Sequence, residues 1–107
     1  MTTFDDRASR FESEFAHDEE MQFKVHARRD KLVGAWAAEL LGLSGSEAEE
    51  YAKSVVRADL QEPGDDDVFR KLRGDLDRAR DKVTDEEIRA KMDAFLAEAI
   101  TELTGTP

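Results

Sequence analysis

The stretch TDEEIRAKMDAFLAEAITEL, residues 84–103, decides the fold. Its apolar residues recur every three or four positions and form one stripe on a helix: Ile88, Met92, Phe95, Leu96, Ala99 and Leu103. Thr84 and Glu87 have the spacing of a capping box, in which each side chain bonds the other residue's backbone N–H. The pattern predicts an amphipathic helix over 85–103, with its apolar side in a core.

Three further segments of the 107-residue chain carry similar stripes, separated by LGLSGSE (41–47), EPGDDD (62–67) and DKVTDEE (81–87). No stretch alternates with the period of a β-strand. Short connections between amphipathic helices are typical of an antiparallel four-helix bundle. We therefore expect an all-α domain over 19–107, with helices at about 19–41, 45–62, 65–82 and 85–103. The stripes predict these core residues: Val25, Leu32, Val33, Trp36, Leu40, Ala48, Tyr51, Ala52, Val55, Val68, Phe69, Leu72, Leu76 and Ala79.

Charge and composition exclude several classes of protein. The net charge is −10, from 26 acidic and 16 basic residues, so we expect neither nucleic acid nor an anionic membrane surface as a partner. There is no cysteine, which excludes disulfides and thiolate chemistry. No apolar run is long enough to cross a bilayer, and no signal peptide is recognisable. We expect a cytoplasmic protein that is a monomer when free.

The N-terminal segment FDDRASRFESEF, residues 4–15, carries Phe4, Ala8, Phe11 and Phe15 on one helical face. Asp18 and Gln22 interrupt this face before the first bundle helix. Residues 1–18 are therefore expected to form an amphipathic arm, flexible or extended when free. Two interpretations stay open at this point: the arm folds back over the end of the bundle, or it inserts into a groove on another protein.

Arg29 falls within the apolar stripe of the first bundle helix, and Asp59 occupies a core-facing position of the second. In an antiparallel pair of helices the two residues lie level, which predicts a partly buried ion pair. The alternative is that Arg29, with Lys24 and Arg28, receives a phosphate or carboxylate. Trp36 and Tyr51 have the positions of core residues, although they are also able to stack on a ligand.

Catalytic patterns are scarce. HDEE (17–20) and DDD (65–67) fit acidic helix starts better than a zinc or calcium site, so no metal is expected. GLSG lacks the lysine and the spacing of a phosphate-binding loop, and no nucleophile–base set is recognisable. We expect a protein that is not an enzyme and requires no cofactor.

Five segments together resemble the zeta subunit of alphaproteobacterial F-type ATP synthases: FDDR (4–7), FAHDEE (15–20), ARRDKLVGAWAAELLGL (27–43), YAKSVVRADLQEPGDDDVFRKL (51–72) and IRAKMD (88–93). The resemblance implies a small four-helix bundle that inhibits ATP hydrolysis by the catalytic head of the synthase, peripheral to the inner membrane through that complex. It further implies that the N-terminal segment is the inhibitory element, with Phe4, Asp5, Asp6, Arg7, Phe11 and Phe15 as its working residues.

The resemblance also implies ADP or ATP as a weak regulatory ligand, for which Lys24, Arg28 and Arg29 are the candidate residues. Asp30 stands where asparagine is common in that family, which makes the surroundings of Arg29 less favourable to an anionic nucleotide. Residues 8–10, Ala-Ser-Arg, also depart from a Glu-Lys type of sequence. Two alternative functions stay open: an adenine-nucleotide sensor of the same complex, and an assembly factor that does not inhibit.

Overall fold

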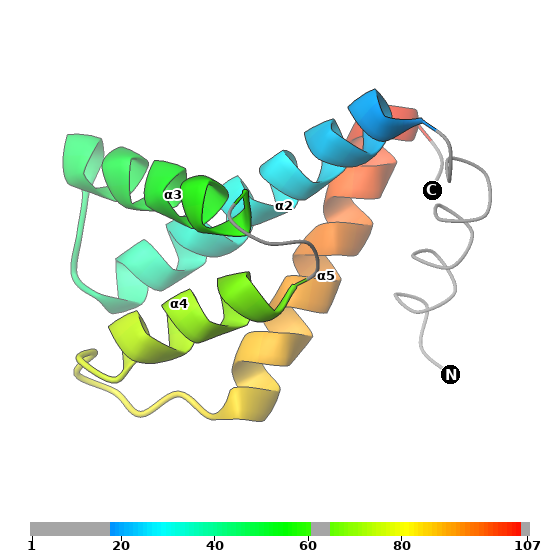
Figure 1. Ribbon diagram of the computed structural model, residues 1–107. Helices are drawn as coiled ribbons and strands as arrows, with labels where there is room; N and C mark the ends of the chain where they lie inside the picture. The colour runs from blue at the N-terminus through cyan, green and yellow to red at the C-terminus, as the bar shows by residue number, and fades with distance from the viewer. Residues whose placement is uncertain (1–17, 61–64, 106–107) are drawn as a thin grey trace.

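Four α-helices make up the part of the chain that the structure, a computed structural model, describes: residues 18–60 and 65–105 (Figure 1). They are α2 (Glu19–Leu40), α3 (Gly45–Asp59), α4 (Asp66–Leu76) and α5 (Asp85–Thr104), and these residues include no strand. Successive helices reverse direction, and α2 contacts the other three. The predicted all-α helical bundle is confirmed.

The helix ends follow from local sequence. Thr84 and Glu87 form the predicted capping box at the start of α5: the Glu87 backbone N–H donates to Thr84 Oγ1 at 3.1 Å, and the Thr84 N–H donates to Glu87 Oε1 at 3.3 Å. After α2, Gly42 adopts a φ of +78°, and the Leu43 N–H bonds the Ala38 carbonyl oxygen at 2.9 Å. This left-handed turn ends α2 and reverses the chain into α3.

Two helices are shorter than the sequence predicted. α4 ends at Leu76 instead of 82, because backbone bonds from Arg78 to Asp75 and from Ala79 to Leu76 turn the chain. Ala79 thus reaches the core from a turn and not from a helix. α3 ends at Asp59 instead of 62. Pro63 follows closely, and a proline disfavours helix in the residue before it.

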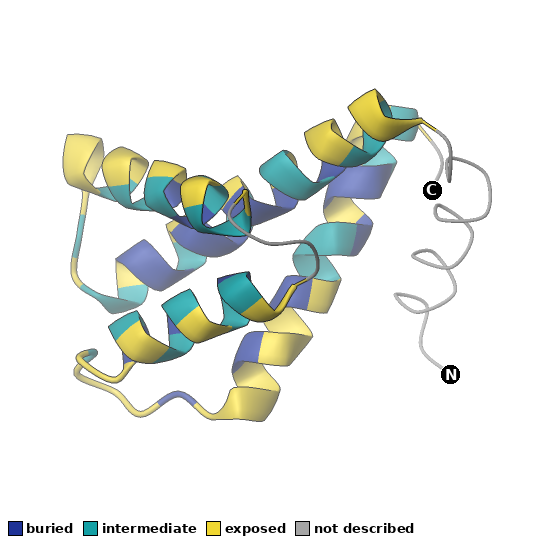
Figure 2. Ribbon diagram, viewed as in Figure 1, coloured by how far each residue is buried: buried dark blue, intermediate teal, exposed yellow. Residues whose placement is uncertain are grey.

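The main core lies where α2, α3, α4 and the first half of α5 meet (Figure 2). Its buried members are Val33, Ala37, Val55, Val68, Leu72, Leu76, Val83, Ile88 and Met92. Of the other residues expected in the core, Leu32 and Ala48 are half-buried, and the following residues are half-buried against this core: Trp36, Leu40, Tyr51, Phe69, Ala79 and Phe95. Burial of apolar surface here provides most of the stabilisation of the bundle.

The second half of α5 packs against the start of α2 in a smaller cluster of Val25, Ala99 and Ile100, with Met21 and Leu96 at its edge. α5 crosses α2 and α4 obliquely (Figure 1), so its buried side changes along its length. Ile100 and Ala97 are therefore buried although the stripe did not include them, whereas Leu103, which it did include, is 38% exposed.

Candidate functional site

The predicted inhibitory arm enters the bundle at Asp18, whose side chain caps α2 by accepting a hydrogen bond from the Met21 backbone N–H at 2.9 Å. The six residues predicted to inhibit lie outside the described residues: Phe4, Asp5, Asp6, Arg7, Phe11 and Phe15. Their role stays a prediction. What the structure describes is the part of the bundle to which the arm is joined.

That part is a junction between the first turns of α2 and the last turns of α5. Val25 of α2 is fully buried against Ala99 and Ile100. Beside this contact the Arg28 Nε donates to Glu102 Oε2 at 2.6 Å, which ties the two helices together at the surface. The arm is thus joined to a helix end that is fixed by both apolar and charged contacts.

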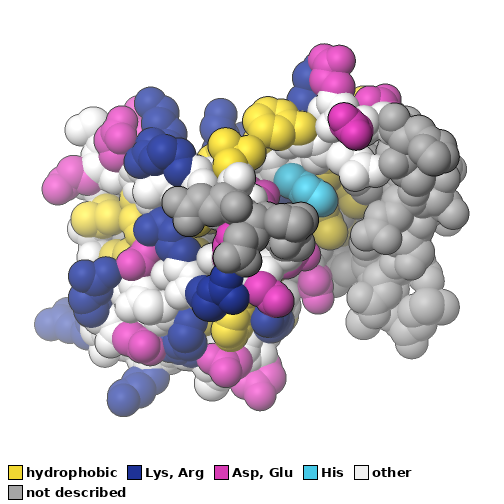
Figure 3. Space-filling view, in the orientation of Figure 1, with side chains coloured by type: hydrophobic (Ala, Val, Ile, Leu, Met, Phe, Trp, Pro, Cys, Tyr) yellow, Lys and Arg dark blue, Asp and Glu magenta, His cyan; other side chains and the backbone are white. Residues whose placement is uncertain are grey.

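Large exposed apolar side chains are few in the described residues 18–60 and 65–105. Phe23, on α2 close to the start of the bundle, is 54% exposed, and Leu60 at the end of α3 is 61% exposed. On the face in Figure 3, acidic and basic side chains lie next to one another, with apolar side chains in small separate areas. A wide apolar docking surface is not visible on this face of the described bundle.

Arg29 is the buried centre of a cluster of charges from α2, from the end of α3 and from the residue that precedes α4. Its Nε is 2.7 Å from Asp30 Oδ1, and its Nη2 lies 3.0 Å from Asp65 Oδ1 and 3.6 Å from Asp59 Oδ2. The predicted pair of Arg29 with Asp59 is therefore present. The sequence did not predict Asp65, which lies in an acidic run interpreted as a helix start. It placed the charge of Asp30 near Arg29, but it did not predict that the two residues form an ion pair.

The pKa values of this cluster are shifted by burial and by its neighbours. Burial lowers the pKa of Arg29, but the carboxylates of Asp30 and Asp65 outweigh it, and the pKa is raised overall. Burial and a hydrogen bond to Asp59 raise the pKa of Asp30 to about 8, against the opposing charge of Arg29. Arg29 stays a cation under all ordinary conditions, whereas Asp30 is able to titrate near neutral pH.

The three residues predicted to bind a nucleotide differ in their exposure to solvent. Arg29 is 1% exposed, and its guanidinium is enclosed by carboxylates. Lys24 and Arg28 are exposed, but each faces a carboxylate: Lys24 Nζ lies 3.1 Å from Glu20 Oε1, and Arg28 bonds Glu102. Nucleotide binding by these residues stays a prediction, which on this geometry concerns Lys24 and Arg28 more than Arg29.

Trp36 and Tyr51 both pack against the main core, as core residues do. The Tyr51 hydroxyl donates to Asp75 Oδ2 at 2.8 Å, and Lys71 Nζ lies 2.9 Å from the same oxygen. Burial and the bond to Asp75 raise the pKa of Tyr51. Its hydroxyl therefore links α3 to α4 instead of facing a ligand.

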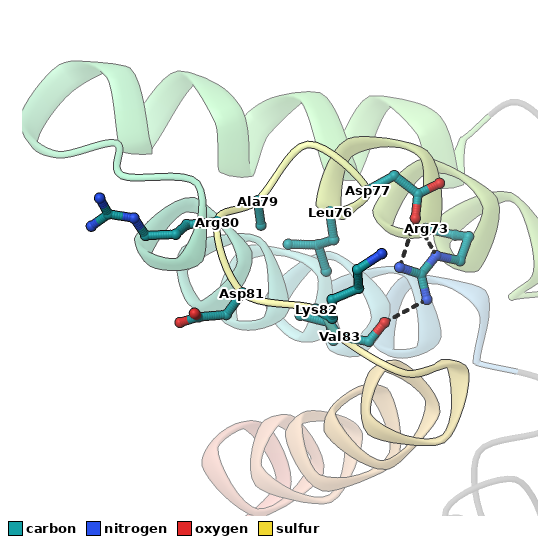
Figure 4. Close-up of a pocket in the computed structure, with 8 residues that line it drawn as sticks. All are labelled: Arg73, Leu76, Asp77, Ala79, Arg80, Asp81, Lys82 and Val83. Atoms are coloured by element: carbon teal, nitrogen blue, oxygen red, sulfur yellow. Dashed lines mark hydrogen bonds and ion pairs between the residues drawn. The ribbon is translucent and has the colours of Figure 1, made fainter.

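A hollow of about 90 Å³ lies at the loop between α4 and α5 (Figure 4). Arg73 of α4 crosses its edge: Nη1 donates to the Val83 carbonyl oxygen at 2.7 Å, and Nη2 donates to Asp77 Oδ1 at 2.8 Å. Nη1 also bonds Asp85 at the start of α5. The volume is below that of ordinary small-molecule sites, and Arg73 links α4 to the loop and to the start of α5.

The described residues contain no group of three His, Cys, Asp or Glu side chains placed to hold a metal ion. Within the same two stretches, 18–60 and 65–105, none of the helices has the length and apolar character needed to cross a membrane.

The fold and the junction of the described residues define a small all-helical bundle whose first helix follows residues 1–17. The sequence profile of the family ATPase inhibitor subunit zeta matches residues 1–102, and the chain belongs to this family. It is also similar to a protein whose structure was solved by solution NMR, with 50% sequence identity and a TM-score of 0.70 over 79% of this chain and 96% of that chain. The comparison with curated proteins gave no match.

Membership in this family indicates a regulatory role as an inhibitor of an ATPase, and it implies an interaction with the ATP synthase. The profile begins at residue 1 and therefore includes the N-terminal arm as well as the bundle.

Proposed function

We propose that this protein inhibits ATP hydrolysis by the catalytic head of an F-type ATP synthase, by inserting its N-terminal amphipathic segment at a catalytic subunit interface. The observation that carries the proposal is that the family match includes residues 1–18, where three phenylalanines share one helical face. A helix with one apolar face commonly binds in an apolar groove of another protein.

The described bundle supports this division of roles. Its own apolar stripes are used in the two cores, and its exposed apolar residues are scattered. The junction of α2 with α5 joins the arm to the bundle through the buried Val25, with the solvent-exposed pair of Arg28 with Glu102 beside it. The arm inhibits to the extent that it binds one state of the catalytic interface better than the others, because equal affinity shifts no equilibrium.

The test measures ATP hydrolysis by the cognate catalytic head with the full chain and with a version that lacks residues 1–16. This truncation keeps Asp18, the N-cap of α2, so the helix start is preserved. Inhibition by the full chain alone is the expected result. Equal inhibition by both proteins would place the inhibitory site in the bundle, and no inhibition by either would favour the sensor or assembly function.

Single substitutions sharpen this test. Phe11→Ala and Phe15→Ala each remove one apolar side chain of the arm, and we expect each to weaken inhibition by at least about tenfold, the effect of losing one buried phenylalanine. Phe23→Ala is the matched control, because Phe23 is an exposed phenylalanine on the bundle. It should leave inhibition unchanged. A larger effect of Phe23→Ala than of the arm variants would contradict the proposal.

The nucleotide prediction is tested separately by titration with ADP. If Lys24 and Arg28 bind the phosphates, Arg28→Ala should abolish binding without unfolding the bundle, because the Arg28 side chain is 43% exposed. Inhibition that depends on ADP would identify the protein as a sensor. Inhibition unaffected by ADP would leave the arm as the sole regulatory element.

A further inference from the structure

The cluster around Arg29 is a junction of three helices built from charges. Arg29 and Asp30 belong to α2, Asp59 is the last residue of α3, and Asp65 immediately precedes α4. The side chains of Arg29 and Asp30 are each 1% exposed, that of Asp59 is 13% exposed, and that of Asp65 is 46% exposed. Water therefore reaches the cluster mainly at Asp65.

The charges of the cluster do not balance. One guanidinium faces three carboxylates, so full ionisation leaves two uncompensated negative charges, and a buried charge without a partner is costly. In addition, Asp30 Oδ2 is buried and receives no hydrogen bond from a donor group in the described residues, so its hydrogen bond with the Asp59 carboxyl group requires a proton on one of the two acids. A proton on this oxygen removes one negative charge and supplies a donor where an ionised carboxylate has none.

Apart from Asp59, the charged side chains on the neighbouring helices interact with groups other than Asp30. On α5, Glu98 and Glu102 act on Arg28. Arg89 of α5 lies 3.6 Å from Asp66, and Lys91 lies over the Trp36 ring. On α4, Arg70 pairs with Asp67, and on α3 Arg57 is exposed. The groups that face Asp30 are therefore Arg29 and Asp59, with His26 one turn earlier on α2.

We propose that Asp30 is protonated in the folded protein near neutral pH, and that this proton makes the junction of α2, α3 and α4 a pH-sensitive element. With the proton in place, Asp30 bonds the Asp59 carboxylate and Arg29 bridges to Asp65, which holds the end of α3 and the start of α4 against α2. Loss of the proton at alkaline pH adds a buried negative charge and loosens this junction.

The direction of the effect follows from the difference between the folded and unfolded states. Burial, with the bond to Asp59, raises the pKa of Asp30 to about 8 in the folded protein, whereas an aspartate in an unfolded chain has a pKa of about 4. The stabilisation due to the proton is thus complete below about pH 4. It declines as the pH rises and is lost at the folded pKa.

The first measurement is a ¹³C NMR titration of the side-chain carboxyl groups of the full-length wild-type protein. The Asp30 signal should titrate with a midpoint near 8. Exposed aspartates in the same spectrum, which ordinarily titrate near pH 4, are the internal reference. An Asp30 midpoint below about pH 5, the range of exposed carboxylates, would overturn the proposal, and this result needs no variant.

The second measurement compares amide hydrogen exchange in the wild type and in Asp30→Asn, in which the amide replaces the protonated carboxyl at equal size. After correction for intrinsic exchange, protection of the amides of Ala58, Asp59 and Leu60 in the wild type should fall by up to about tenfold per pH unit until Asp30 is ionised. The variant should keep its protection over the same range.

This comparison also separates Asp30 from His26, since histidine side chains ordinarily titrate near pH 6.5 and His26 is present in both proteins. A loss of protection with the same pH dependence in wild type and variant would contradict the proposal. If the variant were poorly folded, the wild-type NMR titration alone would still decide whether Asp30 holds the proton.

Discussion

The two halves of α2 are buried in different ways. In the second half, residues 31–40, Val33 and Ala37 are enclosed by apolar side chains of the other helices. In the first half, Val25 is buried in a much smaller cluster, and Arg29 with Asp30 takes the place of apolar residues. The stabilisation from apolar contacts grows with the buried area and does not depend on the ionisation of side chains. A buried polar cluster, in contrast, is stable only when every member keeps its partner. The first half of α2, which carries the arm, should therefore be the more easily disturbed.

Arg29→Ala should have the largest effect on the free energy of unfolding. The change removes the cation that pairs with Asp30, Asp59 and Asp65, and these carboxylates lose its charge. Loss of one partner of a buried ion pair costs about 3–5 kcal/mol. Urea denaturation of the variant and the wild type measures the loss. A loss below about 1 kcal/mol, the range of exposed pairs, would show that water replaces the guanidinium and that the two halves do not differ.

Gly34→Ala tests the middle of α2, where the backbone of α3 lies close to Gly34. A Cβ atom at residue 34 would lie 2.8 Å from the Ala52 Cα, a backbone atom that cannot move aside as a side chain does. We expect a loss of about 1–3 kcal/mol from overpacking, despite the higher helix propensity of alanine.

The matched control is Gly74→Ala, because a Cβ added at Gly74 in α4 meets no atom within 4 Å apart from its chain neighbours and the nearby backbone of its own helix. There the helix propensity acts alone and should stabilise the protein by up to about 1 kcal/mol. Thermal unfolding of the two variants should therefore shift in opposite directions. A shift of both in the same direction would show that α3 is able to move away from α2.

Thr84→Ala removes the capping box of α5, and we expect a loss of about 1 kcal/mol. The effect should be smaller than at Gly34, because Thr84 is exposed and no helix has to move. Thr84→Ser keeps the hydroxyl that accepts from Glu87 and should be nearly neutral. Equal losses for alanine and serine would mean that the methyl group, and not the cap, stabilises this end.

The capping box shows what the sequence alone is able to predict. Thr84 and Glu87 interact within four residues, so their spacing determines the contact. The apolar stripes of α2 and α4 likewise predicted Val33, Leu72 and Leu76 as core residues, because helical periodicity is a local property. The pair of Arg29 with Asp59 was predicted because a short turn sets the register of α2 against α3.

The features that the sequence did not predict depend on the position of α5 and on loops. Ile100 is buried because α5 crosses α2 obliquely, which no single helix encodes. The loop that follows the early end of α4 contacts Arg73, which donates to the Val83 carbonyl oxygen ten residues further along the chain. Asp65 joins the cluster at Arg29 from the start of α4, and its partner is far away in sequence. Contacts between residues that are far apart in the sequence form only when the helices are packed, so the periodicity of a single helix does not predict them.

Arg28→Ala should have the smallest effect, although Arg28 is adjacent to Arg29. The Arg28 side chain is 43% exposed and its partner Glu102 is 37% exposed, so both are well solvated when the pair is broken. We expect no measurable change in the denaturation midpoint at neutral pH. Arg28 lowers the pKa of Glu102 through their hydrogen bond, so any stabilisation by the pair is present above the ordinary pKa of a glutamate. It declines below that pKa and is lost as the pH falls through the lowered pKa of the folded protein. A loss comparable to that of Arg29→Ala would show that the contact of α2 with α5, and not the buried cluster, holds the first half of α2 in place.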